Sequence, residues 1–68
     1  MDKISLAAAR VNSCLSQKEA AVCLGVSNKT LSKWERGASF PSVEMIPKIC
    51  ALYGRPYDGI KFLPDDSL

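Results

Sequence analysis

The sequence predicts an all-α fold, a compact bundle of about five short helices. Serines placed to cap helices are followed by glycines placed to end them. No stretch alternates apolar and polar residues long enough to indicate a sheet. The 68 residues have room for one domain, and we expect it to span 1–68, with a core over about 4–63 and a frayed tail over 64–68.

The first two helices are predicted over 4–12 and from residue 17 onward. Residues 4–12 are rich in strong helix formers. Ser16 and Glu19 have the spacing of a capping box, in which each side chain accepts a hydrogen bond from the other residue's backbone N–H. The second helix therefore begins at Gln17, and Gly25 ends it. The inward-facing residues of these two helices are Leu6, Ala9, Arg10, Ala20, Ala21 and Leu24.

A third helix is predicted to begin after Ser27, which serves as its N-cap, and to run to about Arg36 before Gly37. Only Gly25-Val26-Ser27 separates it from the helix before, and Val26 can fill the corner between the two. Two helices joined by so short a turn with a glycine in it form a helix-turn-helix motif.

The fourth helix is predicted to end at Gly54, and its beginning is left open. Pro47 fits the first turn of a helix and disrupts a later one, so either a regular helix begins at Ile46 or a looser turn opens it at Val43. The apolar stripe of this helix consists of Ile46, Ile49, Cys50 and Tyr53. A short fifth helix or helical turn is predicted over 57–62. It is expected to cover the core with two apolar residues, Ile60 and Leu63.

Composition excludes several classes of protein. A hydrophobic content of 47% against 24% charged residues argues against intrinsic disorder, and no apolar run approaches the ~20 residues that cross a bilayer. Without histidine there is no Ser-His-Asp triad and no Cys-His pair. There is also no phosphate-binding glycine loop and no clustered carboxylate pair. We therefore expect no enzyme activity, no cofactor, no metal and no small-molecule ligand.

The cysteines are odd in number and have no CxxC spacing. Together with the absence of a secretory signal, this indicates a reducing compartment and a cytoplasmic location. Fewer than four thiolates cannot make a metal site of cysteines alone. We expect Cys14, Cys23 and Cys50 to serve as small apolar residues.

The helix over 28–36 has two unlike faces. On a period of 3.6 residues, Leu31, Trp34 and Glu35 lie on one side. The other side carries three cations, an amide and a hydroxyl, with no acidic residue among them: Lys29, Lys33, Arg36, Asn28 and Ser32. Such groups read base edges in the major groove of DNA. The alternative is an ordinary solvated face, but the tight turn and the capping box beside it favour DNA.

The stretch over 15–37 closely resembles the helix-turn-helix family of the Cro/C1 (Xre) type, which includes phage repressors and Cro proteins. The shared pattern is Gln17…Ala21…Leu24-Gly25-Val26-Ser27…Leu31…Trp34-Glu35-Arg36-Gly37, with Pro41 after it. The likeness extends to about residues 5–63. It implies a lambda repressor-like DNA-binding domain of five helices, whose third helix enters the major groove as the recognition helix.

The resemblance also implies roles for individual residues. Four would contact base edges: Ser27, Asn28, Lys29 and Lys33. Four would contact the DNA backbone: Gln17, Thr30, Arg36 and Ser42. Lys18 is expected at the backbone on separate grounds, because Gln17 and Lys18 form a pair of donors at a helix N-terminus, where phosphate binds. Arg10 and Glu35 look like the family's internal ion pair between the first and third helices.

The sequence departs from the family pattern at three places, one of which is the loop over 38–42, where no cation is present to contact the DNA backbone. Cys14 stands where the family usually has the glycine that ends the first helix, so either the turn is altered or Cys14 adopts a left-handed conformation. Val22 and Cys23 stand where relatives often carry polar residues on the outer face of the second helix. That apolar pair could mark a contact surface.

From these observations we expect a sequence-specific transcriptional regulator, a repressor of phage type or small Xre type, located at the bacterial nucleoid. It would bind double-stranded DNA as a homodimer on a pseudo-palindromic operator. The candidates for the dimer contact are Leu52, Tyr57, Phe62 and the C-terminal end of the sequence. The alternative is a protein-interaction module with the same fold, such as an anti-repressor or an antitoxin. The cationic face over 28–36 favours the first, because a protein-binding variant is expected to lose it.

Overall fold

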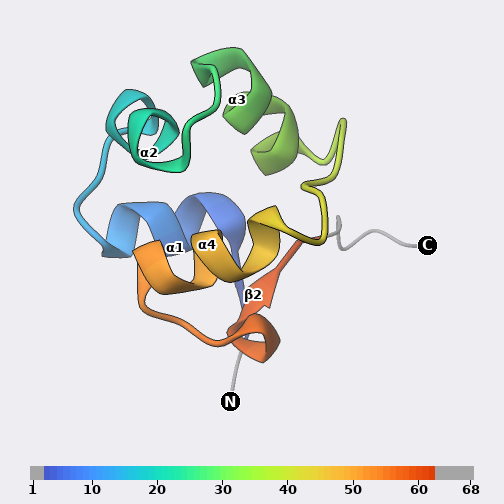
Figure 1. Cartoon of the computed structure of the whole chain (residues 1–68). Helices are drawn as coiled ribbons and strands as arrows, with labels where there is room; N and C mark the ends of the chain where they lie inside the picture. The colour runs from blue at the N-terminus through green and yellow to red at the C-terminus, as the bar shows by residue number, and fades with distance from the viewer. Residues whose placement is uncertain (1–2, 63–68) are drawn as a thin grey trace.

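Serine side chains begin three of the helices. In the computed structural model, which describes residues 3–62, Ser5, Ser16 and Ser27 each accept a hydrogen bond of 3.0 Å from the backbone N–H three residues ahead. The four helices are α1 (Leu6–Asn12), α2 (Gln17–Leu24), α3 (Asn28–Arg36) and α4 (Met45–Tyr53). In Figure 1, α2 and α3 lie together on one side of the pair formed by α1 and α4.

The predicted all-α class is confirmed, and the expectation that the chain has no strand is wrong. A short strand, β1 (Ile4–Ser5), pairs in parallel with β2 (Ile60–Lys61), and Ile4 lies opposite Ile60. Strands of two residues have no room for an alternating pattern, and these two come from opposite ends of the described chain. Local sequence patterns therefore cannot reveal their pairing.

The predicted helices at the two ends are shorter than expected. The helix predicted over 4–12 begins only at Leu6, because the Ser5 hydroxyl caps it while the Ser5 backbone stays extended. The helix predicted over 57–62 is one 3-10 turn, η1 (Tyr57–Gly59), after which Ile60 is extended and buried. Leu63 and the tail over 64–68, for which we predicted a core contact and fraying, lie outside the described residues.

The looser of the two predicted beginnings of α4 is the one observed. The chain turns at Val43 and Glu44, and the carbonyl of Ser42 accepts hydrogen bonds from the backbone N–H groups of Met45 and Ile46 at 3.0 and 3.2 Å. Pro47 lies in the first turn of α4, where a backbone N–H has no acceptor within the helix. The proline therefore removes no helical hydrogen bond.

One apolar core connects the four helices to the sheet. Its buried residues are Leu6, Ala9, Ala20, Ala21, Leu24, Leu31, Trp34, Ile49, Tyr53, Ile60 and Phe62. Every inward position predicted for α1 and α2 belongs to it except Arg10. Leu31 is fully buried, and burial of such a side chain stabilises the fold by about 1.5–3 kcal/mol. Because Leu31 and Trp34 fix one side of α3 against the bundle, the opposite side is left at the surface.

The phenol of Tyr53 brings one polar group into this core. Its hydroxyl is buried, and within residues 3–62 it has no hydrogen-bond partner. Burial, followed by the negative charge of Glu35, raises the pKa of Tyr53 to about 12, against a smaller opposite effect of Arg10. The hydroxyl therefore stays protonated at neutral pH.

Cys14 adopts the left-handed conformation, the second of the two alternatives. Its φ is 62°, and it is the one non-glycine residue within 3–62 with a positive φ. Its backbone N–H donates to the carbonyl of Val11 at 2.9 Å, and its side chain is exposed. For a residue with a Cβ, this conformation costs roughly 1–2 kcal/mol.

Candidate nucleic-acid interface

The turn between α2 and α3 is built around a left-handed glycine. Gly25 has φ 75° and ψ 27° and ends α2. The backbone N–H of Val26 then donates to the carbonyl of Ala21 at 3.0 Å, while the half-buried Val26 side chain packs on the core. A Cβ on residue 25 would meet nothing within 4 Å, so the conformation and not the space requires glycine. This is the predicted helix-turn-helix motif.

The start of α2 is fixed by the predicted capping box. The Ser16 backbone N–H donates to Glu19 Oε1 at 2.9 Å, and the Glu19 N–H donates to Ser16 Oγ at 3.0 Å. The first of these bonds, and then a bond to the hydroxyl, lower the pKa of the Glu19 carboxyl. Lys18 is exposed beside this cap.

The outward face of α3 carries the residues proposed to reach bases. Asn28, Lys29 and Lys33 are all exposed, and none of the three makes a side-chain hydrogen bond within residues 3–62. The acidic residue of this helix, Glu35, points the other way, and its side chain is 7% exposed. An amide and two ammonium groups are therefore available to a partner on a face without a negative charge.

Ser27, the fourth residue expected at base edges, is engaged within the chain. Its hydroxyl accepts from the Thr30 backbone N–H at 3.0 Å and donates to Thr30 Oγ1 at 2.9 Å. A hydroxyl has one proton, so Ser27 has none left to donate. Thr30 keeps its own hydroxyl proton for an outside acceptor.

The remaining residues expected at the DNA backbone are spread over three elements. Arg36, at the end of α3, is exposed, and its Nε donates to Ser32 Oγ at 3.4 Å. Ser42 is exposed in the loop before α4, and Gln17 is half-buried as the first residue of α2.

Arg10 and Glu35 lie together as expected, and Gln17 joins them. The Arg10 Nε is 2.7 Å from Glu35 Oε2, and the two side chains are 15% and 7% exposed. The Gln17 Nε2 donates to Glu35 Oε1 at 3.0 Å. This last contact was not predicted, because Gln17 and Glu35 lie on different helices and no local spacing relates them. The available signals are helical periodicity and the family ion pair, both of which place Glu35 inward.

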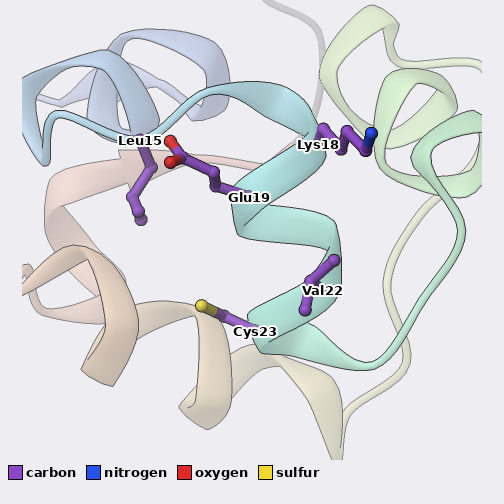
Figure 2. Close-up of a pocket in the computed structure, with 5 residues that line it drawn as sticks. All are labelled: Leu15, Lys18, Glu19, Val22 and Cys23. Atoms are coloured by element: carbon purple, nitrogen blue, oxygen red, sulfur yellow. The ribbon is translucent and has the colours of Figure 1, made fainter.

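An apolar hollow lies on the outer side of α2 (Figure 2). It is shallow, has a volume of about 410 Å³, and is lined by Leu15, Lys18, Glu19, Val22 and Cys23. Val22 is 73% exposed. Figure 2 shows the Lys18 side chain extending away from Leu15 and Glu19. The two apolar departures from the family pattern thus form part of one hollow.

The three residues expected at a dimer contact differ in exposure. Tyr57 is exposed and stacks on the ring of Phe62, with ring centroids 5.5 Å apart. Phe62 is buried and also meets Phe40 edge-on, with centroids 6.5 Å apart. Leu52 is half-buried against the core. Only Tyr57 of the three presents a large surface, because Phe62 is used within the chain.

Two other kinds of site are absent from residues 3–62. No group of three or more histidine, cysteine, aspartate or glutamate side chains there could hold a metal ion. No helix in that range is long and apolar enough to cross a membrane.

The fold and the exposed face of α3 define a helix-turn-helix DNA-binding domain. The family model for helix-turn-helix domains matches residues 6–60, and the chain belongs to this family, which is of the Cro/C1 (Xre) type. The family is a DNA-binding one typical of transcriptional regulators, and it is not a family of enzymes. No curated protein and no solved structure gave a significant match to the chain.

Proposed function

We propose that the chain is a sequence-specific transcriptional repressor that reads the major groove with α3. The observation that supports this most directly is the exposed, acid-free face of that helix. The Asn28 carboxamide can pair with adenine, and the ammonium groups of Lys29 and Lys33 can donate to guanine. Ser27 belongs to the same end of α3, and we assign it to capping because its proton is already engaged.

The DNA backbone would be held on both sides of this helix. Gln17 and Lys18 lie at the N-terminus of α2, where unpaired backbone N–H groups favour a phosphate. Thr30 and Arg36 retain donors on α3, and Ser42 adds a hydroxyl from the loop. These contacts set the position of α3 on the duplex and carry no sequence information themselves.

We further propose that residues 1–68 act as one DNA-binding domain and bind as a homodimer. A single module of this kind buries only about 600–1,000 Å² on DNA. Two copies on a pseudo-palindromic operator double that area and place their recognition helices ~34–36 Å apart. Tyr57, exposed and stacked on Phe62, is the candidate contact between the copies.

Selection from a random DNA library tests the proposal. We expect enrichment of a sequence with a two-fold repeat whose half-sites are about one helical turn apart. No enrichment at low salt would overturn sequence-specific binding. Enrichment of a single unrepeated site would overturn the proposal that the chain binds as a homodimer. It would not affect the proposal that α3 recognises the bases.

Lys33 is exposed on the outward face of α3. Lys33→Ala should cost about 1–3 kcal/mol of binding free energy on the selected site and relax the preference at one base position. Titration of selected and random duplexes measures both effects. Lys48→Ala, which removes the same charge from the exposed face of α4, is the matched control and should leave base preference unchanged. An equal loss on both duplexes would instead make Lys33 a backbone contact.

A second candidate function is favoured by the hollow on α2. Its apolar lining, with Val22 and Cys23 exposed, suits a protein partner, as in an anti-repressor or an antitoxin. The selection experiment distinguishes the two functions, because a module that binds only protein enriches no DNA sequence.

A further inference from the structure

We propose that Glu35 is a positioning residue for DNA binding. It holds the side chain of Gln17 so that one amide proton is engaged and the other is directed to a phosphate. This inference rests on the proposed function, since it gives a role to a residue that makes no DNA contact of its own.

One contact constrains the two side-chain N–H donors of Gln17. A glutamine carboxamide has two N–H donors on one nitrogen. One of them donates to Glu35 Oε1 at 3.0 Å, across the gap between α2 and α3. Because the carboxamide is planar, engaging one N–H restricts the directions that the second can take. That second donor belongs to a half-buried side chain at the exposed start of α2.

Glu35 can act in this way because its carboxylate is itself held. Oε2 accepts from Arg10 Nε at 2.7 Å, and Oε1 accepts from Arg10 Nη2 at 3.4 Å as well as from Gln17. Arg10 Nη1 donates to the carbonyl of Leu15 at 2.9 Å, directly before the residue that caps α2. One carboxylate therefore connects α1, the beginning of α2 and α3.

The consequence for binding is a lower entropic cost. A free glutamine on a surface must lose its rotamer freedom when it meets a phosphate, and that loss reduces affinity. In this chain the freedom of Gln17 is lost on folding. Its contact with phosphate should thus contribute more affinity than an unheld glutamine would.

The test compares the effect of Gln17→Ala in two backgrounds. One is the unchanged chain, and the other carries Arg10→Met with Glu35→Leu, which removes both charges together and leaves neither unpaired. The probe is a labelled random-sequence duplex at low salt, because phosphate contacts are independent of sequence. Gln17→Ala should weaken binding about tenfold in the unchanged chain and by less than about twofold in the second background.

Lys18→Ala is the matched control. Lys18 is the next residue of α2 and makes no side-chain hydrogen bond within residues 3–62, so its loss should have the same effect in both backgrounds. A rescue variant, Arg10→Met with Glu35→Gln, returns an acceptor oxygen to position 35. The effect of Gln17→Ala should return in part, because Arg10 no longer holds that oxygen in place.

If the chain with Arg10→Met and Glu35→Leu fails to fold, NMR of the unchanged chain provides an independent test. The side-chain amide protons of Gln17 should be ordered in NMR spectra before any DNA is added. Equal effects of Gln17→Ala in both backgrounds, or an amide that is mobile without DNA, would overturn the positioning role. A chain that binds no duplex at low salt would instead overturn the proposed function, whatever the state of that amide.

Discussion

Cys14 is a residue in a backbone conformation that its Cβ opposes. Its φ of 62° suits glycine, and its side chain is exposed, so removing the side chain sacrifices no packing. Cys14→Gly should relieve the strain of this conformation, but glycine also has more freedom in the unfolded chain, which offsets part of the gain. The net result should be an increase of about 0.5–1 kcal/mol in the free energy of unfolding. Chemical denaturation measures the change. Cys14→Ala keeps the Cβ and should have no effect, so an equal gain from alanine would contradict the strain.

Tyr53 places a hydroxyl group in the apolar core. Its buried hydroxyl has no partner within residues 3–62, so Tyr53→Phe should leave the free energy of unfolding at neutral pH unchanged or slightly higher. A loss of more than about 1 kcal/mol would show that the hydroxyl does have a partner.

The same substitution should change stability at high pH. The pKa of Tyr53 in the folded chain is about 12, above its usual value of 10.0, so folding favours the neutral phenol. The stability from this group is complete below pH 10 and is lost as the pH rises from 10 toward 12. Thermal unfolding in that range should show the loss in the unchanged chain and not in Tyr53→Phe. Tyr57→Phe, at an exposed tyrosine, should retain it.

The stability of α2 depends on the hydrogen bonds of the capping box in its first turn. Folding lowers the pKa of Glu19, so the stability from this carboxylate is present above the usual pKa of 4.5 and is lost as the pH falls below it. Glu19→Gln should make the unfolding free energy less sensitive to acid in this range, as measured by denaturation at several pH values. Glu44→Gln is the control, because Glu44 precedes α4 without a side-chain capping bond. A similar change from both variants would contradict the role of the capping box.

The elements also show what the sequence can predict. The starts and ends of α2 and α3 follow from Ser16, Gly25, Ser27 and Gly37, each acting on backbone within a few residues of itself. The pairing of β1 with β2 and the contact between Gln17 and Glu35 join segments far apart in the sequence. They depend on how the helices pack, and no local pattern contains that information.

The same limit applies to the site residues: local patterns predict which side chains face outward, but not the contacts that those side chains make. Helical periodicity is enough to place Asn28, Lys29 and Lys33 outward and Leu31 inward on α3. It cannot show that the proton of the Ser27 hydroxyl is already engaged by Thr30, because that depends on a rotamer. The residues that make a face can be predicted, whereas the donors that remain free on it cannot.

For the molecule as a whole, the net charge of +2 is a poor guide to its partner. In the proposed complex, the cations on the outward face of α3 and at the start of α2 would act locally, and each phosphate that they neutralised would release counterions. Affinity for a random duplex should therefore fall steeply as salt rises. Lys18→Ala should reduce the slope of log affinity against log salt by about 1, and Lys48→Ala should leave it unchanged. Affinity that is independent of salt would contradict docking through this face.

The pairing of Ile4 with Ile60 has a consequence for synthesis of the chain. As the polypeptide leaves the ribosome, β1 emerges first and has no partner until residues 60–61 have followed it. The sheet, and with it the burial of Ile60 in the core, cannot form without residues 60–61, so a chain stalled before residue 60 carries an unpaired first strand.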